Sequence, residues 1–291
     1  MTNKPVNKLK DWVELTKLKI MIPVSLTGFT GYFAFEPHFS SKAFLSSLGI
    51  LLLAISASVL NQIQEIETDS KMNRTCNRPL PARKISIRDA ILFLLFNLIS
   101  GIIILYYAGN LRALVIGLIT IFWYNGIYTY SKRITAFAVV PGAVTGALPP
   151  LIGWVAAGGG LWAKPIIFIE FLIFIGQIPH FWLLILKYGD EYKQAGIPSL
   201  TDIFDRSQIK RLTFSWIVSS VVAALFLCCF EIIKSTVLNV ILVVVSVSLV
   251  WQFFGLLKIQ SEKDNYKRYS VALDLYFLLV LLLLISDRII K

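Results

Sequence analysis

Nine long apolar stretches constrain the fold of this chain more than any other feature. An α-helix needs about 20 apolar residues to cross the hydrocarbon core of a bilayer. Stretches of this kind lie near residues 14–34, 44–66, 87–108, 110–130, 135–157, 165–188, 210–230, 235–256 and 270–287. They fill a chain in which 56% of the 291 residues are hydrophobic. The sequence therefore predicts an all-α polytopic membrane protein with nine transmembrane helices, forming a single transmembrane domain over residues 1–291.

Lysine and arginine are distributed unevenly over the connections between these stretches. If successive stretches cross in alternate directions, 22 of the 28 lysines and arginines fall on the side of the N-terminus. Basic residues favour the cytoplasmic side, which predicts a cytoplasmic N-terminus, an external C-terminus and residence in the cytoplasmic (inner) membrane. The net charge of +11 then reflects topology and attraction to lipid headgroups. Nucleic-acid binding is not expected, because no soluble basic domain is present.

The end of the second stretch carries the first chemically informative residues. In "NQIQEIETDSKMNRTCNRPL", Asn61, Glu65 and Asp69 follow one another at i, i+4 and i+8, which places them on one face of a continuous helix. Such a column of oxygen atoms repels itself unless a cation neutralises it. Magnesium prefers oxygen ligands and is commonly held by one or two carboxylates and substrate phosphates. We therefore expect these three residues to bind Mg²⁺.

Two long cytoplasmic connections, residues 68–86 and 189–206, are expected to form the catalytic face. The second begins with Asp190 and Glu191, at the inner end of the sixth stretch. Two acidic groups on one membrane face can hold metal ions that share one diphosphate. Asp190 and Glu191 are therefore the remaining predicted metal ligands.

Basic residues at the same face fit the phosphate groups. Arg74 and Arg78 lie about one helical turn apart in the first connection, and Lys132 and Arg133 follow the fourth stretch. Guanidinium groups can bind two phosphate oxygens at once. Carboxylates for a metal and cations for phosphates together predict an enzyme that stabilises a diphosphate leaving group. The structural alternative is a set of solvated charges at helix ends.

The order of these residues resembles a known family. The pattern N-x-x-x-[DE]-x-x-x-D followed by R-T-x-x-R-P-L resembles the first signature of the UbiA superfamily of intramembrane prenyltransferases. Within that superfamily, "SKRITAFAVVPGAVTGALPPLIGWVAAGG" at 131–159 and "QIPHFWLLILKYGDEYKQAGIP" at 177–198 are similar to the protoheme IX farnesyltransferase branch. The resemblance extends from about residue 15 to residue 200.

This resemblance implies a nine-helix bundle around a central cavity, with the metal and diphosphate at its cytoplasmic mouth. It implies Mg²⁺ as the cofactor, and farnesyl diphosphate and heme B as substrates that meet within the membrane lipid. By the same resemblance, the catalytic metal ligands are Asn61, Glu65, Asp69 and Asp190. The implied diphosphate-binding residues are Arg74, Arg78, Tyr128 and Lys132. An association with heme A synthase or with terminal oxidase assembly is a further implication.

The chain departs from the family pattern in two places. Four residues after Asp190 stands Gln194, where aromatic prenyltransferases have a second aspartate, so Glu191 is the candidate replacement. In the first stretch, a K-P-R pattern of relatives reads K-L-K at residues 17–19. Lys19 therefore offers only a point charge where relatives have an arginine.

The implied reaction is an electrophilic alkylation. Departure of the diphosphate leaves an allylic farnesyl cation, a heme vinyl group attacks it, and water quenches the new cation to give heme O.

Two alternatives stay open. A UbiA-type enzyme with an aromatic acceptor, such as 4-hydroxybenzoate or a quinone precursor, fits the same metal site. A secondary transporter fits the helices interrupted by proline and glycine, although its ion-binding groups are expected near the bilayer centre.

His180 and Asp274 are two of the ionisable residues inside the predicted spans. His180, in "IPHFW", is the candidate heme-binding residue, because a polar ring within a membrane indicates a functional site. It would ligate the heme iron or contact a propionate, or else bond to a backbone carbonyl freed by Pro179. Asp274 is expected to pair with a nearby cation. The small residues of "GALPPLIGW" are expected to allow close helix packing.

Overall fold

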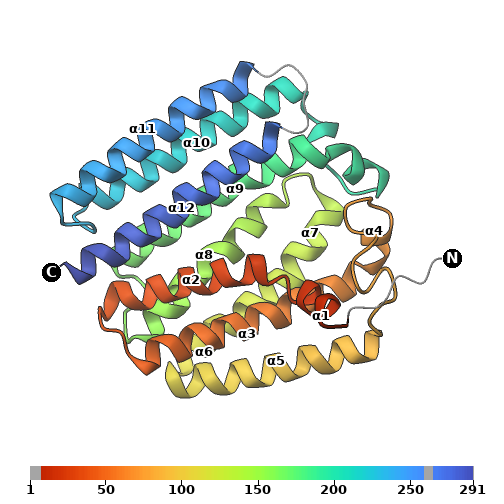
Figure 1. Ribbon diagram of the computed structural model, residues 1–291, viewed down its shortest axis with the longest axis horizontal. Coiled ribbons are helices and arrows are strands. Elements are labelled where there is room, and N and C mark those ends of the chain that lie inside the picture. Colours follow the sequence, from red (N-terminus) through yellow and green to blue (C-terminus); the bar gives the residue numbers. More distant parts are fainter. Residues whose placement is uncertain (1–7, 259–264, 291) are drawn as a thin grey trace.

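The computed structural model describes residues 8–258 and 265–290, and its regular structure is helical (Figure 1). Within these residues no strand occurs, which confirms the all-α prediction. The longer helices are α2 (Leu18–Phe35), α3 (Ser41–Gln64), α5 (Ile87–Ala108), α6 (Leu111–Phe122), α8 (Val139–Ala156), α9 (Lys164–Gln194), α10 (Arg206–Cys229), α11 (Thr236–Lys258) and α12 (Asn265–Ile289). The shorter elements are α1 (Lys8–Thr16), α4 (Ile66–Ser70), the π-helix η1 (Trp123–Tyr128), α7 (Thr129–Ile134) and the 3-10 helix η2 (Leu200–Asp202).

Nine spans in the described part of the chain are long and apolar enough to cross a membrane, as the sequence predicts. The fourth is composite, because α6, η1 and α7 follow one another without a break over Leu111–Ile134. Large apolar side chains such as Phe96, Phe122 and Trp251 are exposed on the outer helices. A surface of this kind is stable against lipid and not against water, so the protein is an integral membrane protein. Lys4, the first basic residue of the N-terminal arm, and residues 259–264 of the last predicted connection lie outside the described residues.

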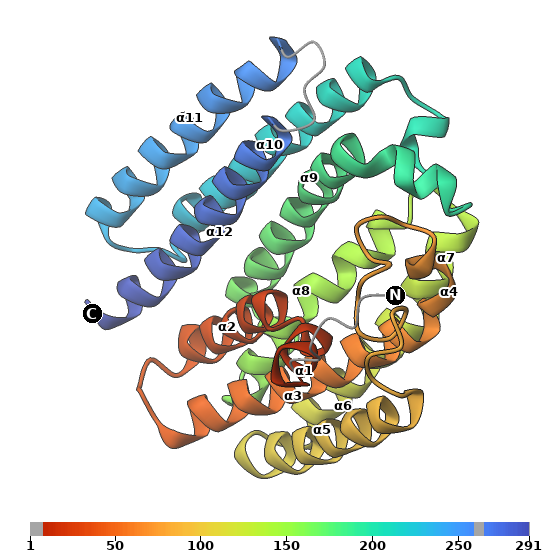
Figure 2. The same ribbon diagram turned by 45° about the vertical axis from the view of Figure 1, so that its right-hand side comes forward.

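The short elements gather at one end of the bundle. In Figure 1, α1, α4 and α7 lie at the right, and the C-terminus lies at the opposite end. Helices α10, α11 and α12 run beside one another in both Figure 1 and Figure 2, and α9 packs against α8, α10 and α12. Helix α2 packs against α3 and α8. The two connections predicted to carry the chemistry therefore extend from the same end.

Close contact between α2 and α8 depends on glycine. An added Cβ on Gly153 would lie 1.8 Å from the carbonyl oxygen of Gly28, and one on Gly31 would lie 2.0 Å from that of Pro150. Neither position has room for a side chain, so the two backbones touch directly. This confirms the close packing expected of the "GALPPLIGW" segment.

The sixth span is longer than the sequence pattern predicts. Helix α9 continues to Gln194, beyond the expected end at residue 188, so Asp190 and Glu191 lie on a helix and not in a loop. The helix ends where Gly196 adopts a left-handed conformation, with φ 71°. The Gly196 and Ile197 amides then donate to carbonyls of the last turn. Glycine favours such a helix end because it has no Cβ.

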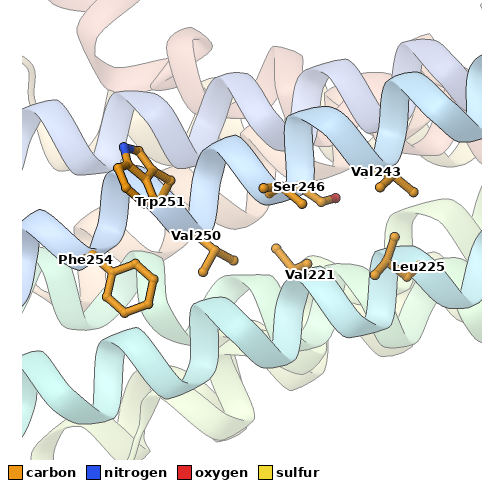
Figure 3. A pocket seen from close by; sticks show the side chains of 8 residues that line it. Val221, Leu225, Val243, Ser246, Val250, Trp251 and Phe254 are labelled. Carbon is orange, nitrogen blue, oxygen red and sulfur yellow. The ribbon is translucent and has the colours of Figure 1, made fainter.

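A groove of about 230 Å³ lies between α10 and α11 (Figure 3). Its walls are apolar side chains such as Val221, Leu225 and Phe254. Ser246, the one polar residue of the lining, has its hydroxyl 2.9 Å from that of Tyr276. With no charged residue in its walls, this groove cannot hold a diphosphate, and the charged end of the bundle is the relevant site.

Candidate active site

The end of α3 brings Glu65 to a basic residue of the fourth span. Helix α3 stops at Gln64, and Glu65 leaves helical geometry with φ −107° and ψ 12° before α4 begins. The expected continuous helix through residues 61–69 is therefore interrupted. Arg133 donates to the Gln64 carbonyl at 2.8 Å and satisfies a group exposed at the break. Lys132 forms an ion pair with Glu65.

Asp69 is buried and pairs with Arg78. The Nη1 atom of Arg78 lies 2.7 Å from Oδ2 of Asp69. Thr75 also donates its hydroxyl to the backbone carbonyl of Asp69, at 2.8 Å. These bonds close the first connection into a compact turn. In the structure, Asp69 and Glu65 therefore each pair with a different cation, Arg78 and Lys132.

Asn61 is held by the fourth span. Its Nδ2 donates to the Thr129 hydroxyl at 3.0 Å, at the start of α7. The π-helix η1 lies immediately before this point, and in it Asn125 donates to the Ala57 carbonyl at 3.0 Å. π-Helical turns are often found at functional sites. Here the turn brings two polar side chains against α3 and aligns the fourth span with Asn61.

Lys17 lies at the centre of these charges. It is half-buried at the junction of α1 and α2, in a left-handed conformation with φ 49° and ψ 41°. The pKa of its ammonium group is lowered to about 7, first by burial and then by the nearby cations Arg78 and Lys132, against the opposing effect of Glu65 and Asp69. The sequence pattern pointed to Lys19 at this place, but Lys19 is exposed. Lys17 is the cation that the fold directs into the site.

The two predicted acidic residues of α9 have contacts of their own. Glu191 accepts a hydrogen bond from the backbone amide of Arg74, at 3.0 Å. The guanidinium of Arg74 lies 4.9 Å from the ring centre of Tyr188. Glu191 and Tyr188 therefore attach the first connection to α9. Asp190 is largely exposed and lies 3.3 Å from Arg206 of α10.

Tyr128 links the charged cluster to the interior of the bundle. The ammonium group of Lys132 lies 4.9 Å from the Tyr128 ring centre. On its other side, that ring lies 6.1 Å from the Phe181 ring of α9, in an edge-on arrangement. An added Cβ on Gly142 would come within 2.7 Å of the ring, so α8 fixes its position. Tyr128, predicted to bind diphosphate, thus adjoins the predicted diphosphate ligand Lys132.

The two ionisable residues predicted inside the spans meet each other. Nδ1 of His180 lies 3.1 Å from Oδ1 of Asp274, joining α9 and α12. When His180 is protonated, Asp274 therefore has the cationic partner that the sequence predicts. His180 has a carboxylate neighbour, which the sequence analysis did not foresee.

The acidic side chains fit a magnesium ion that is partly held by its substrate. In the described residues, no group of three or more His, Cys, Asp and Glu is arranged to hold a metal. Magnesium commonly needs only one or two protein carboxylates, because substrate phosphates and waters complete its coordination. Glu65 and Asp69, both close enough to affect the charge of Lys17, supply hard oxygen ligands of this type.

Some members of the site were not found by sequence reasoning. Thr129 and Asn125 carry no charge, and their only signal is polarity inside an otherwise apolar span. The position of Lys17 depends on a break between α1 and α2 that the sequence pattern does not reveal. By contrast, the partners Glu65, Asp69, Arg78 and Lys132 were all found from their residue types and order.

A family model and individual relatives of this chain point to the same protein family. Residues 21–281 match the model of the UbiA prenyltransferase family. A protoheme IX farnesyltransferase of Oleidesulfovibrio alaskensis is 32% identical over 95% of both chains, and one of Cytophaga hutchinsonii is 35% identical over 69% of this chain and 71% of its own.

Solved structures show the same fold. A digeranylgeranylglyceryl phosphate synthase has a TM-score of 0.75 and 21% identity, covering 98% of this chain and 99% of its own. A UbiA homologue from Archaeoglobus fulgidus, bound to DMAPP and Mg²⁺, has a TM-score of 0.64 and 15% identity, covering 92% and 99%. Family model, sequence relatives and fold agree, and the chain belongs to the UbiA prenyltransferase family of membrane enzymes.

Proposed function

We propose that this enzyme transfers farnesyl from farnesyl diphosphate to a vinyl group of heme B and so makes heme O. One observation is the main support for prenyl transfer. At one end of the bundle, the cations Lys17, Lys132 and Arg78 surround the carboxylates of Glu65 and Asp69. The choice of heme as acceptor is supported by the names of the relatives, which are 32% and 35% identical to this chain.

The charged cluster would act on the leaving group. Asp69 and Glu65, with Asn61 beside them, would hold Mg²⁺, which supplies positive charge to the diphosphate oxygens when bound. A solved relative bound to DMAPP and Mg²⁺ supports Mg²⁺ as the cofactor. With Asp69 and Glu65 holding Mg²⁺, their present partners Arg78 and Lys132 would be available to bind the phosphate oxygens.

The protein would accelerate the reaction mainly by stabilising charge that develops on the departing diphosphate. Fixed cations in a site with little water act strongly on such charge. Arg74 would add a second guanidinium, since Tyr188 and Glu191 hold it over the site. Tyr128 would separate this charged end from the apolar interior that receives the prenyl chain. The acceptor vinyl group then attacks the farnesyl cation, and a water molecule adds and loses a proton.

The proposed location is the cytoplasmic (inner) membrane, with the charged end of the bundle in the cytoplasm. The excess of lysine and arginine on that side of the predicted topology supports this orientation. Farnesyl diphosphate would then reach the site with its phosphates in water and its chain in the bilayer.

A product assay tests the proposed function. Purified enzyme is incubated with farnesyl diphosphate, Mg²⁺ and either heme B or 4-hydroxybenzoate, and products are identified by mass spectrometry. We expect heme carrying farnesyl plus water, and no such product with EDTA. If only the benzoate is prenylated, the proposal of prenyl transfer stands but heme is not the acceptor. No turnover with either acceptor would contradict the proposal as a whole.

Lys17 should make diphosphate binding depend on pH. Because its pKa is about 7, the side chain is cationic below pH 7 and neutral above it. Affinity for farnesyl thiodiphosphate should therefore fall as the pH rises through 7. Arginine keeps its charge throughout this range, so Lys17→Arg should lose this pH dependence and Lys17→Met should bind weakly at every pH.

Isothermal titration of the three proteins between pH 6 and pH 8.5 measures this effect. The ligand's own ionisation is common to all of them and cancels in the affinity ratios. Identical profiles for wild type, Lys17→Arg and Lys17→Met would show that Lys17 does not contact the diphosphate.

A further inference from the structure

The contact between His180 and Asp274 lies within two membrane spans. Charged or polar side chains are costly inside a bilayer and mark functional sites unless they only hold helices together. A pair that only joins helices is expected in the dry contact between them. Here 61% of the Asp274 side chain and 33% of the His180 side chain are exposed. A ligand can therefore reach this pair.

Helix packing fixes the two side chains opposite each other. An added Cβ on Gly176 would lie 1.9 Å from the Phe277 ring, so that ring rests directly on the backbone of α9. Gly176 lies about one turn before His180, and Phe277 lies about one turn after Asp274. The contact holds α12 in the register that brings Asp274 to His180.

The arrangement suits an imidazole that binds a metal through its other nitrogen. Metal-bound histidines usually have their second ring nitrogen held by a carboxylate or carbonyl group, which fixes the tautomer and the direction of the ring. Asp274 lies within hydrogen-bonding distance of Nδ1, and this leaves Nε2 as the coordinating atom. In the described residues, His180 has no other polar contact.

The pair also lies near the proposed site of prenyl transfer. His180 precedes Phe181, whose ring contacts Tyr128, and Tyr128 carries the ammonium group of Lys132 on its face. Along α9, His180 lies ten residues before Asp190, about 15 Å at 1.5 Å per residue. Phe181 and Tyr128 thus connect the segment of α9 that carries His180 to the charged cluster.

We propose that Asp274 is a positioning residue: it holds Nδ1 of His180 so that Nε2 binds the iron of the heme acceptor. This inference rests on the proposed function and adds to it a specific attachment of the acceptor between α9 and α12. It assigns a role to Asp274, which lies outside residues 15–200, where the quoted motifs stand.

Heme titration in the absence of turnover tests this proposal. Heme B is added to the full-length enzyme with farnesyl thiodiphosphate, and absorption spectra give the affinity, the axial ligation and the midpoint potential. His180→Ala should lose the spectrum of a histidine ligand and regain it with added imidazole. Asp274→Ala should bind heme about 10-fold to 100-fold more weakly.

The Asp274→Asn variant distinguishes a role of Asp274 in positioning His180 from a role in helix packing alone. An asparagine oxygen still accepts from Nδ1 but carries no charge, so this variant should bind heme more tightly than Asp274→Ala and show a higher midpoint potential than wild type. Glu170→Gln is the matched control, because Glu170 is a carboxylate within the α9 span and lies more than two turns from His180. Its affinity and potential should equal those of wild type.

The outcomes distinguish this inference from the proposed function. If wild type farnesylates heme but the His180 and Asp274 variants keep its affinity, spectrum and potential, the attachment is wrong and the function stands. If wild type neither binds nor farnesylates heme, the function itself fails. An equal effect of Glu170→Gln would also overturn the specific role of Asp274.

Discussion

Asp69→Asn should lower the rate of prenyl transfer by about 100-fold or more, the usual cost of losing a group that stabilises charge in the transition state. Asp69 is buried against Arg78 at 2.7 Å and is a proposed ligand of Mg²⁺. The substitution keeps the size of the side chain and removes its charge. The Mg²⁺ concentration for half-maximal activity should rise as well, because one of two carboxylate ligands is lost.

Glu67→Gln is the control for this prediction. Glu67 lies two residues away in the same short helix α4, but it is exposed and pairs with Lys71 at the surface, at 2.9 Å. Surface pairs of this kind contribute little, so the rate and the Mg²⁺ dependence should match wild type. Steady-state kinetics over a range of Mg²⁺ concentrations measures both variants. A wild-type Mg²⁺ dependence in Asp69→Asn would remove Asp69 from the metal site.

Gly153→Val should destabilise the bundle by about 1–3 kcal/mol or more, the usual cost of forcing atoms into a packed interior. Even a Cβ at this position would lie 1.8 Å from the carbonyl oxygen of Gly28. That atom is backbone and cannot move without displacing α2 from α8. Since Lys17 immediately precedes α2, the separation should also weaken diphosphate binding.

Gly160→Ala is the matched control, because no atom lies within 4 Å of a Cβ added there. Its midpoint of thermal unfolding in detergent should equal that of wild type, whereas that of Gly153→Val should be lower. Equal midpoints for the two variants would mean that α2 and α8 do not pack as described.

The sequence is sufficient to predict the nine spans and most of the charged residues of the site. Apolar runs near the length of a membrane span are a local signal, because each segment must satisfy its backbone hydrogen bonds within itself. Charged residues at the ends of these runs can also be recognised from the local sequence. Glu65, Asp69, Arg78 and Lys132 were found in this way, and the structure brings them together as two ion pairs.

The tertiary structure was needed to establish which side chains pair and how each helix is rotated against its neighbours. The Asn61–Thr129 bond joins residues 68 positions apart, and the contact of His180 with Asp274 joins helices α9 and α12. No local pattern fixes how two helices rotate against each other; that is decided by close contacts such as Phe277 on Gly176. The break that directs Lys17 into the site is likewise hidden in an apolar run.

The sequence by itself thus determined a membrane bundle of nine spans, the family, and the charged residues that meet at one end of the bundle, because apolar length and residue order are properties of one segment at a time. Only the tertiary structure decided which carboxylate meets which cation, that Asp190 and Glu191 stand on α9, and that a histidine and an aspartate face each other within the membrane. These contacts depend on how whole helices pack, and packing joins segments that are distant in the chain.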